Sequence, residues 1–266
     1  MDAAISPVML RDALDSRAAL TLVDVRRAAD FAADPGMIPG ALRRLPDDPL
    51  AWGAALPAWR PVAVYCVYGH EVSRDTARTL RAFGLDARHL AGGLDAWRAE
   101  GGSVVPHAPP TRWVTRERPK IDRLACPWFV RRFIDADAVF DYVPPQRVLA
   151  HARATGATPF DVPDVEYTHD GERCSFDAFV ARHAPDDPAL AALADIVRAA
   201  DTDRLGDSPQ AAGLLAVSLG MGRLIGDDGA LLRHALLVYD ALYAWCRAAR
   251  DERHGWDATA LRRSAA

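Results

Sequence analysis

Tyr65-Cys66-Val67-Tyr68-Gly69-His70-Glu71-Val72-Ser73 joins a short apolar run to a helical pattern. The run that leads into it, Pro61-Val62-Ala63-Val64-Tyr65, is rich in β-branched residues and predicts a buried strand. Beyond it, apolar residues recur at helical spacing from Ala77 to Leu85, with Ser73 as the expected N-cap. The stretch therefore places a cysteine where a strand ends and a glycine-containing loop enters a helix.

Cys66 is the candidate nucleophile of this stretch. The backbone N–H groups of the loop, from Val67 to Ser73, are expected to converge above the sulfur, and the helix N-terminus adds partial positive charge. Both effects favour the thiolate, which is the reactive form of cysteine, and the same cradle can bind an oxyanion. A buried structural cysteine is the alternative, and the loop alone does not separate the two.

The surrounding residues predict an α/β domain over residues 1–106. Extended runs predict strands at 19–26, 61–65 and 86–90. Helical patterns lie between and around them, at 7–16, 28–33, 49–56, 73–85 and 94–101. Strands that alternate with helices form a mostly parallel sheet flanked by helices.

This domain resembles the rhodanese family through four stretches that occur in the family's order. They are Leu22-Val23-Asp24-Val25-Arg26, Ile38-Pro39-Gly40-Ala41, Val64-Tyr65-Cys66-x-x-Gly69 and Gly92-Gly93-Leu94-x-Ala96-Trp97-x-x-x-Gly101. The resemblance implies that Cys66 accepts a sulfane sulfur as a persulfide and passes it to a nucleophile. It also implies that Asp24 and Arg26 shape the pocket wall, in a structural or a catalytic role.

The loop departs from the family pattern in two ways. Val72 holds the position of the usual capping Ser or Thr, so the loop is one residue longer, as in relatives that handle tetrahedral oxyanions such as phosphate or arsenate. His70 and Glu71 stand where an arginine is common. A carboxylate beside a thiolate opposes anion binding, which a protonated His70 would offset. We therefore favour sulfur or a metal oxyanion over a phosphate ester as substrate, unless both side chains point to solvent.

A proline-rich linker, residues 107–111, separates this domain from a second one, residues 112–250. Seven cations stand against two acids in residues 111–133, although the chain is acidic overall. Trp113 and Val114 predict a strand, and a helix is expected to begin between Asp122 and Pro127. Such an arginine-rich junction is either an oxyanion site or a solvated basic face.

The rest of the second domain predicts a mainly helical α+β fold. Residues 160–176 alternate around an Asp-Gly turn and predict a β-hairpin, followed by a helix to His183. Within the hairpin, Glu166, His169 and Cys174 are candidate metal ligands, although their spacing matches no defined motif. Helices are expected over most of 188–250, with the apolar run 214–224 in the core and a polar tail at 251–266.

The second domain resembles the C-terminal domain of ChrB-type chromate-resistance proteins. The stretches that carry this resemblance are Arg118-Pro119-Lys120-Ile121-Asp122-Arg123, Trp128 through Asp135, Pro159-Phe160-Asp161-Val162-Pro163, Thr168-His169-x-Gly171-x-x-Cys174-x-Phe176-Asp177, Ala200-Asp201-Thr202 and Tyr239-Asp240-Ala241-Leu242-Tyr243. It implies a link to chromate sensing or resistance. Chemistry and resemblance together make Arg116, Arg123 and His169 the expected oxyanion contacts.

Composition narrows the function further. The chain has 266 residues and a net charge of −4, which argues against a general nucleic-acid binder. Its four cysteines form no C-x-x-C pair, and the residue patterns predict neither a signal peptide nor a membrane-spanning run. We expect a cytoplasmic protein that needs no cofactor, acts on thiosulfate or a chromate-like anion with a thiol acceptor, and binds neither nucleic acid nor membrane.

The expected activity is that of a thiosulfate-type sulfurtransferase, with a persulfide on Cys66, coupled to an oxyanion-resistance domain. A chromate sensor with a weak rhodanese domain is the alternative. A chromate-responsive regulator ranks third, because a rhodanese-like domain stands where such repressors carry their DNA-binding region. Residue patterns predict no oligomeric state.

Overall fold

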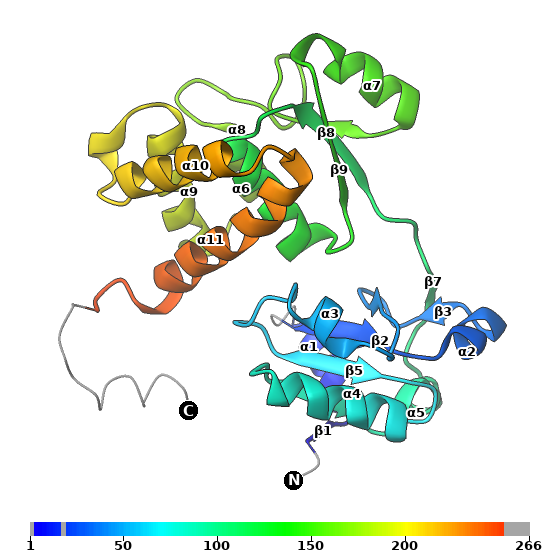
Figure 1. Ribbon diagram of the computed structural model, residues 1–266. Coiled ribbons are helices and arrows are strands. Elements are labelled where there is room, and N and C mark those ends of the chain that lie inside the picture. Colours follow the sequence, from blue (N-terminus) through cyan, green and yellow to red (C-terminus); the bar gives the residue numbers. More distant parts are fainter. Residues whose placement is uncertain (1–2, 17–19, 253–266) are drawn as a thin grey trace. The chain divides into compact units, whose positions relative to one another are not determined.

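The computed structural model describes residues 3–16 and 20–252, and the chain forms two compact units, residues 1–110 and 111–266 (Figure 1). Most of the expected polar tail lies outside the described residues. In the described part of the chain, no helix combines the length and apolar character needed to cross a bilayer.

The first unit is built on a five-stranded sheet in the order β1-β6-β5-β2-β4, in which every pair is parallel. Its strands are β1 (Ala4–Ile5), β2 (Thr21–Asp24), β4 (Leu42–Arg43), β5 (Val62–Tyr65) and β6 (Ala87–Leu90). The helices are α1 (Pro7–Asp15), α2 (Ala28–Ala33), α3 (Pro49–Gly53), α4 (Glu71–Ala82) and α5 (Gly93–Ala99). A small antiparallel pair, β3 (Gly36–Met37) with β7 (Val105–Pro106), lies apart from the sheet. The predicted α/β class is confirmed.

Successive residues of β5 serve two different cores, which makes the unit three layers thick. Ala63 and Tyr65 join the core that holds Trp97 of α5. Val62 and Val64 join the core that holds Leu80 of α4. Both faces of the central strand are therefore dry, as a parallel sheet covered by helices requires.

Helix α4 begins two residues before the predicted cap. Its N-cap is His70, and Ser73 lies fully buried in the first turn. The Ser73 side chain is turned inward, with Oγ 3.2 Å from Cys66 Sγ and 3.3 Å from the His70 carbonyl oxygen. The prediction of Ser73 as N-cap was wrong because this hydroxyl contacts the cysteine.

The second unit has a three-stranded parallel sheet in the order β10-β8-β9. The strands are β8 (Arg112–Arg116), β9 (Val139–Val143) and β10 (Thr158–Pro159). The helices are α6 (Ile121–Phe129), α7 (Val148–Thr155), α8 (Ser175–His183), α9 (Pro188–Asp201), α10 (Ala211–Leu224) and α11 (Asp228–Ala248), with a π-helical turn at Val130–Ile134. Helix α6 packs against α8, α9 and α11, whereas α7 packs on β8. The mainly helical α+β class is confirmed.

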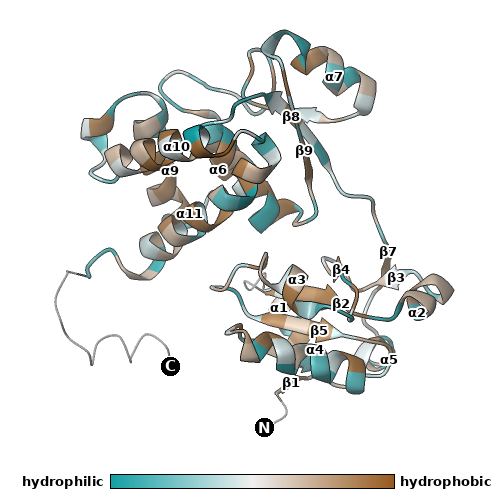
Figure 2. Ribbon diagram, in the orientation of Figure 1, coloured by the Kyte–Doolittle hydropathy of each residue, from teal (hydrophilic) through white to brown (hydrophobic). Residues whose placement is uncertain are grey.

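Two local predictions for the second unit were wrong. Residues 160–176 form a loop with a parallel bridge from Phe160 to Tyr167, because Asp161, at φ 54°, breaks the extended run. Of the predicted hairpin, only the tight turn from Asp170 to Arg173 is present, with one antiparallel bridge. Helix α10, coloured by hydropathy in Figure 2, is not core throughout: only Ala211, Leu214 and Ser218 are buried, and Val217 and Leu219 are exposed.

Candidate functional site

Cys66 lies directly after the carboxyl end of β5, at the edge where ligands bind in parallel sheets. Its residue is 6% exposed and its thiol is free. Contact with Ser73 Oγ places Sγ beneath the first turn of α4. The first amides of a helix have no intrahelical acceptor, so this turn offers donors and a positive dipole end to the sulfur.

Close backbone contacts hold the loop after Cys66 against the start of α5. The amide of Leu94 donates to the Cys66 carbonyl oxygen at 2.9 Å, and that of Asp95 donates to Val67 at 3.1 Å. Gly93 has φ +61°, and a Cβ there would lie 2.5 Å from the Cys66 carbonyl oxygen. Gly69 meets the same turn from the other side, at φ +67°. Only glycine fits this approach, so the loop is preorganised.

The remaining loop side chains lie outside this packed centre. Tyr68, His70 and Glu71 are exposed, and Val67 and Val72 are half-buried. Of the predicted loop, the structure therefore brings only Ser73 to the sulfur through its side chain. Glu71 and His70 face water, which screens their charges from the cradle.

Asp24 and Arg26 form a buried ion pair, exposed by 0% and 1%. The Arg26 fork bonds the Asp24 carboxylate with Nε at 2.9 Å and its terminal nitrogen at 2.6 Å. It also donates to the carbonyl oxygens of Asp34 at 2.7 Å and Gly36 at 2.9 Å. All three guanidinium nitrogens are thus engaged within the fold, so the pair fastens the loop before β3 to β2.

In the second unit, the predicted oxyanion residues Arg116 and Arg123 meet a buried carboxylate. Arg116 ends β8, Arg123 lies in the first turn of α6, and Asp161 follows β10. The Asp161 Oδ2 atom lies 2.5 Å from Arg116 and 3.2 Å from Arg123 Nε, while Ser175 donates to Oδ1 at 2.9 Å. Both guanidinium groups are therefore paired within the protein, although Arg116 remains 39% exposed.

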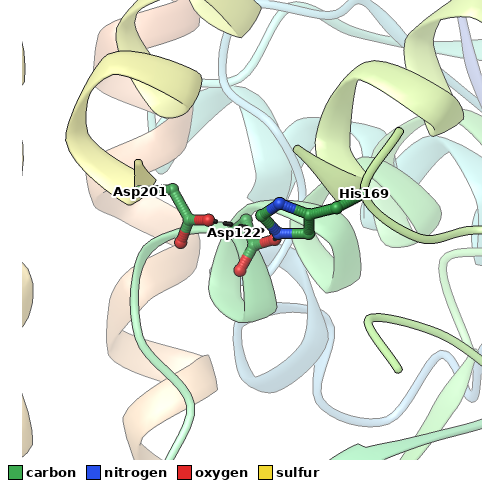
Figure 3. Close-up of side chains that lie close together, drawn as sticks. All are labelled: Asp122, His169 and Asp201. Atoms are coloured by element: carbon green, nitrogen blue, oxygen red, sulfur yellow. Dashed lines mark hydrogen bonds and ion pairs between the residues drawn. The ribbon is translucent and has the colours of Figure 1, made fainter. Parts of the chain in front are cut away.

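His169, the third predicted residue, points into a group of carboxylates (Figure 3). Its Nε2 atom lies 3.2 Å from Asp122 Oδ2, 3.3 Å from Asp201 Oδ2 and 3.4 Å from Asp161 Oδ1. Asp122 opens α6, Asp201 ends α9, and His169 lies in the loop between β10 and α8. The Asp122 side chain is 4% exposed, that of Asp201 16% and that of His169 41%.

Burial and mutual repulsion perturb these groups. Desolvation, followed by the charge of Asp122, raises the pKa of Asp201 to about 7. Desolvation likewise raises the pKa of Asp161. The hydrogen bond to Asp122 raises the pKa of His169, because the protonated ring is the better donor. These perturbed groups gather near the carboxyl ends of β8 and β10, which makes them the candidate site of the second unit.

The predicted metal ligands do not assemble as expected. Glu166 is half-exposed and pairs with Arg182, and Cys174 is buried as the N-cap of α8. Among the described residues, the group whose donor atoms lie within 4.8 Å of one another is Asp122, His169 and Asp201. No aspartate was predicted here. Each lies in a stretch quoted above for the resemblance, which was the available signal.

Comparisons with known protein families also divide the chain into two parts. The family described as "ChrB, C-terminal domain" matches residues 113–246, and the rhodanese-like domain family matches residues 6–100. Protein ChrB of Cupriavidus metallidurans is 34% identical over 147 residues, which cover 52% of this chain and 43% of that protein. The match thus spans less than half of that relative's length.

Solved structures of rhodanese-type proteins are similar to part of this chain. A rhodanese-like domain protein of Staphylococcus aureus is 26% identical, with 41% of this chain and 100% of that chain covered and a TM-score of 0.35. A rhodanese-related protein of Thermoplasma volcanium is 24% identical, with 39% and 97% covered and a TM-score of 0.34.

Proposed function

We propose, from the premise that this chain belongs to the ChrB C-terminal-domain family and carries a rhodanese-like domain before it, that Cys66 is the nucleophile of a sulfurtransferase. The observation that carries the proposal is the position of the sulfur. Sγ lies at the carboxyl end of the central strand, beneath the first turn of α4 and in contact with Ser73 Oγ. A purely structural thiol needs no such loop.

Sulfur transfer proceeds in two displacements. The Cys66 thiolate attacks the outer sulfur of thiosulfate, a new S–S bond forms, and sulfite leaves with the electron pair of the broken bond. A second nucleophile, a thiolate or cyanide, then attacks the terminal sulfur of the persulfide and releases the Cys66 thiolate. Amides at the start of α4 stabilise the negative charge in both steps.

The second unit is proposed to bind an oxyanion of the chromate class through Arg116, Arg123 and His169. Support comes from their convergence, at the ends of β8 and β10, on one partly exposed site. The chain would then couple a thiol to an anion-binding unit, in a role related to chromate resistance. In the alternative, a sensor, the second unit acts alone.

Replacement of the nucleophile tests the first proposal. Cys66→Ser should abolish thiosulfate:cyanide sulfur transfer and the labelling of a protein persulfide in the full-length chain. Cys246→Ser is the matched control, since Cys246 is a buried free thiol on α11, and this variant should keep full activity. Equal transfer and equal labelling in Cys66→Ser and the wild type would exclude the enzyme and leave the sensor.

A further inference from the structure

The donor atoms around His169 are spaced like the ligands of a single ion. Its Nε2 atom lies 3.2 Å from Asp122 and 3.3 Å from Asp201. Two ligands of a tetrahedral ion with bonds of about 2.0–2.1 Å lie about 3.3 Å apart. The side chains therefore already have the separation that a small cation would impose.

A single ring proton does not satisfy this arrangement. One imidazole nitrogen carries at most one hydrogen, which points at one oxygen, yet Nε2 faces oxygens of three carboxylates within 3.4 Å. Asp161 has Arg116, Arg123 and Ser175 as further partners. Asp122 and Asp201 have no such arginine partner within residues 3–16 and 20–252, where their ion pairs are those with His169. Asp122 is also almost fully buried. A buried and a partly buried carboxylate thus share a single ring.

We propose that Asp122, His169 and Asp201 bind a divalent first-row transition metal of the Zn²⁺ or Mn²⁺ class. Two carboxylate oxygens and one imidazole nitrogen, with no sulfur, form a donor set for such ions rather than for Cu⁺ or an iron–sulfur cluster. Three protein ligands leave a fourth position for water or substrate, and His169, 41% exposed, lies on the open side.

The metal would also change which ligand the site attracts. With every group charged, the three aspartates balance Arg116, Arg123 and a protonated His169, so the metal-free site offers an oxyanion no net positive charge. A divalent ion, with His169 neutral as a ligand, would give the same set one net positive charge. This consequence rests on the proposed oxyanion function, whereas the metal site does not depend on it or on Cys66.

Metal titration of the full-length chain tests the site. After treatment with EDTA and its removal, Zn²⁺ and Mn²⁺ should each bind with one site per chain by calorimetry and raise the melting temperature. His169→Gln and Asp201→Asn should each weaken binding by more than about 100-fold, because loss of an outer partner alone costs 10–100-fold. Asp201→Asn also relieves repulsion, so its metal-free form should melt no lower than the wild type.

His151→Gln is the matched control. That ring also contacts a carboxylate, Asp141, at 2.8 Å, but it lies outside the three-residue group, so metal affinity should be unchanged. Absence of saturable binding, or wild-type affinity in both site variants, would overturn the site. So would a thiolate charge-transfer band with Co²⁺, which would place the ion on cysteine. Sulfate that binds the metal-free and metal-loaded chains equally would refute only the gain of positive charge.

Discussion

Arg26→Ala should destabilise the first unit far more than any other charge deletion near β3. Asp24, 0% exposed, would be left as a buried carboxylate without its guanidinium fork, and the carbonyl oxygens of Asp34 and Gly36 would each lose a donor. Removal of one partner of a buried ion pair costs about 3–5 kcal/mol in the free energy of unfolding. A typical domain is stable by only about 5–15 kcal/mol, so a loss of this size should be readily measurable.

Arg98→Ala supplies the matched control on the same loop. Arg98 pairs with the Asp34 carboxylate at 2.5 Å, but the two side chains are 36% and 42% exposed. An exposed pair of this kind contributes about 0–1 kcal/mol. Both variants replace an arginine that contacts Asp34 with alanine. The difference between their losses of unfolding free energy therefore reports the effect of burial.

Native-state hydrogen exchange in the full-length chain measures this effect without interference from the second unit. Amides of β2 and β5, which pair with each other, report the opening free energy of the first unit. The double variant Asp24→Ala/Arg26→Ala should lose less than the sum of the single losses, because it leaves no orphaned charge. A loss in Arg26→Ala below about 1 kcal/mol, or equal to that in Arg98→Ala, would refute the structural role of this pair.

Three further outcomes are expected. Gly93→Ala should prevent persulfide formation, since its Cβ would lie 2.5 Å from the Cys66 carbonyl oxygen, and wild-type labelling would refute the packed loop. Asp240→Ala should cost the second unit about 3–5 kcal/mol in urea unfolding, because it removes the acceptor of the Arg132 fork at 2.8 and 2.9 Å. Burial lowers the pKa of His183, so the fold favours its neutral form. Stability should therefore be full above about pH 6.5 and fall as the pH drops toward the folded pKa, and an equal pH profile in His183→Gln would contradict this.

The fold of the first unit follows from local patterns. The apolar run before Cys66 and the glycine-rich turns are short-range signals, and the structure contains the strand, loop and helix that they predict. The exception is the role of Ser73. The pattern identified Ser73 as a capping residue, but whether its hydroxyl turns to a backbone amide or to Sγ depends on packing across seven residues.

The site in the second unit lay beyond such signals. Asp122 and His169 are 47 residues apart, and nothing local to either shows that they meet. The arginine-rich junction was visible in the sequence, but its neutralisation by Asp161 depends on how β8 and β10 pair. A carboxylate in the loop after β10, such as Asp161, looks like any solvated aspartate until the sheet order is known.

The central position of β8 has a consequence for biosynthesis. Both of its neighbours, β9 and β10, lie later in the chain, so β8 emerges from the ribosome with two unsatisfied edges. At about 5–20 residues per second, the ribosome needs roughly 2–9 s to reach the last of them. During that interval the apolar centre, Trp113-Val114, is flanked by Arg112 and Arg116. Charges at both ends of an exposed strand discourage aggregation. The same arginine that later closes on Asp161 therefore protects the nascent strand.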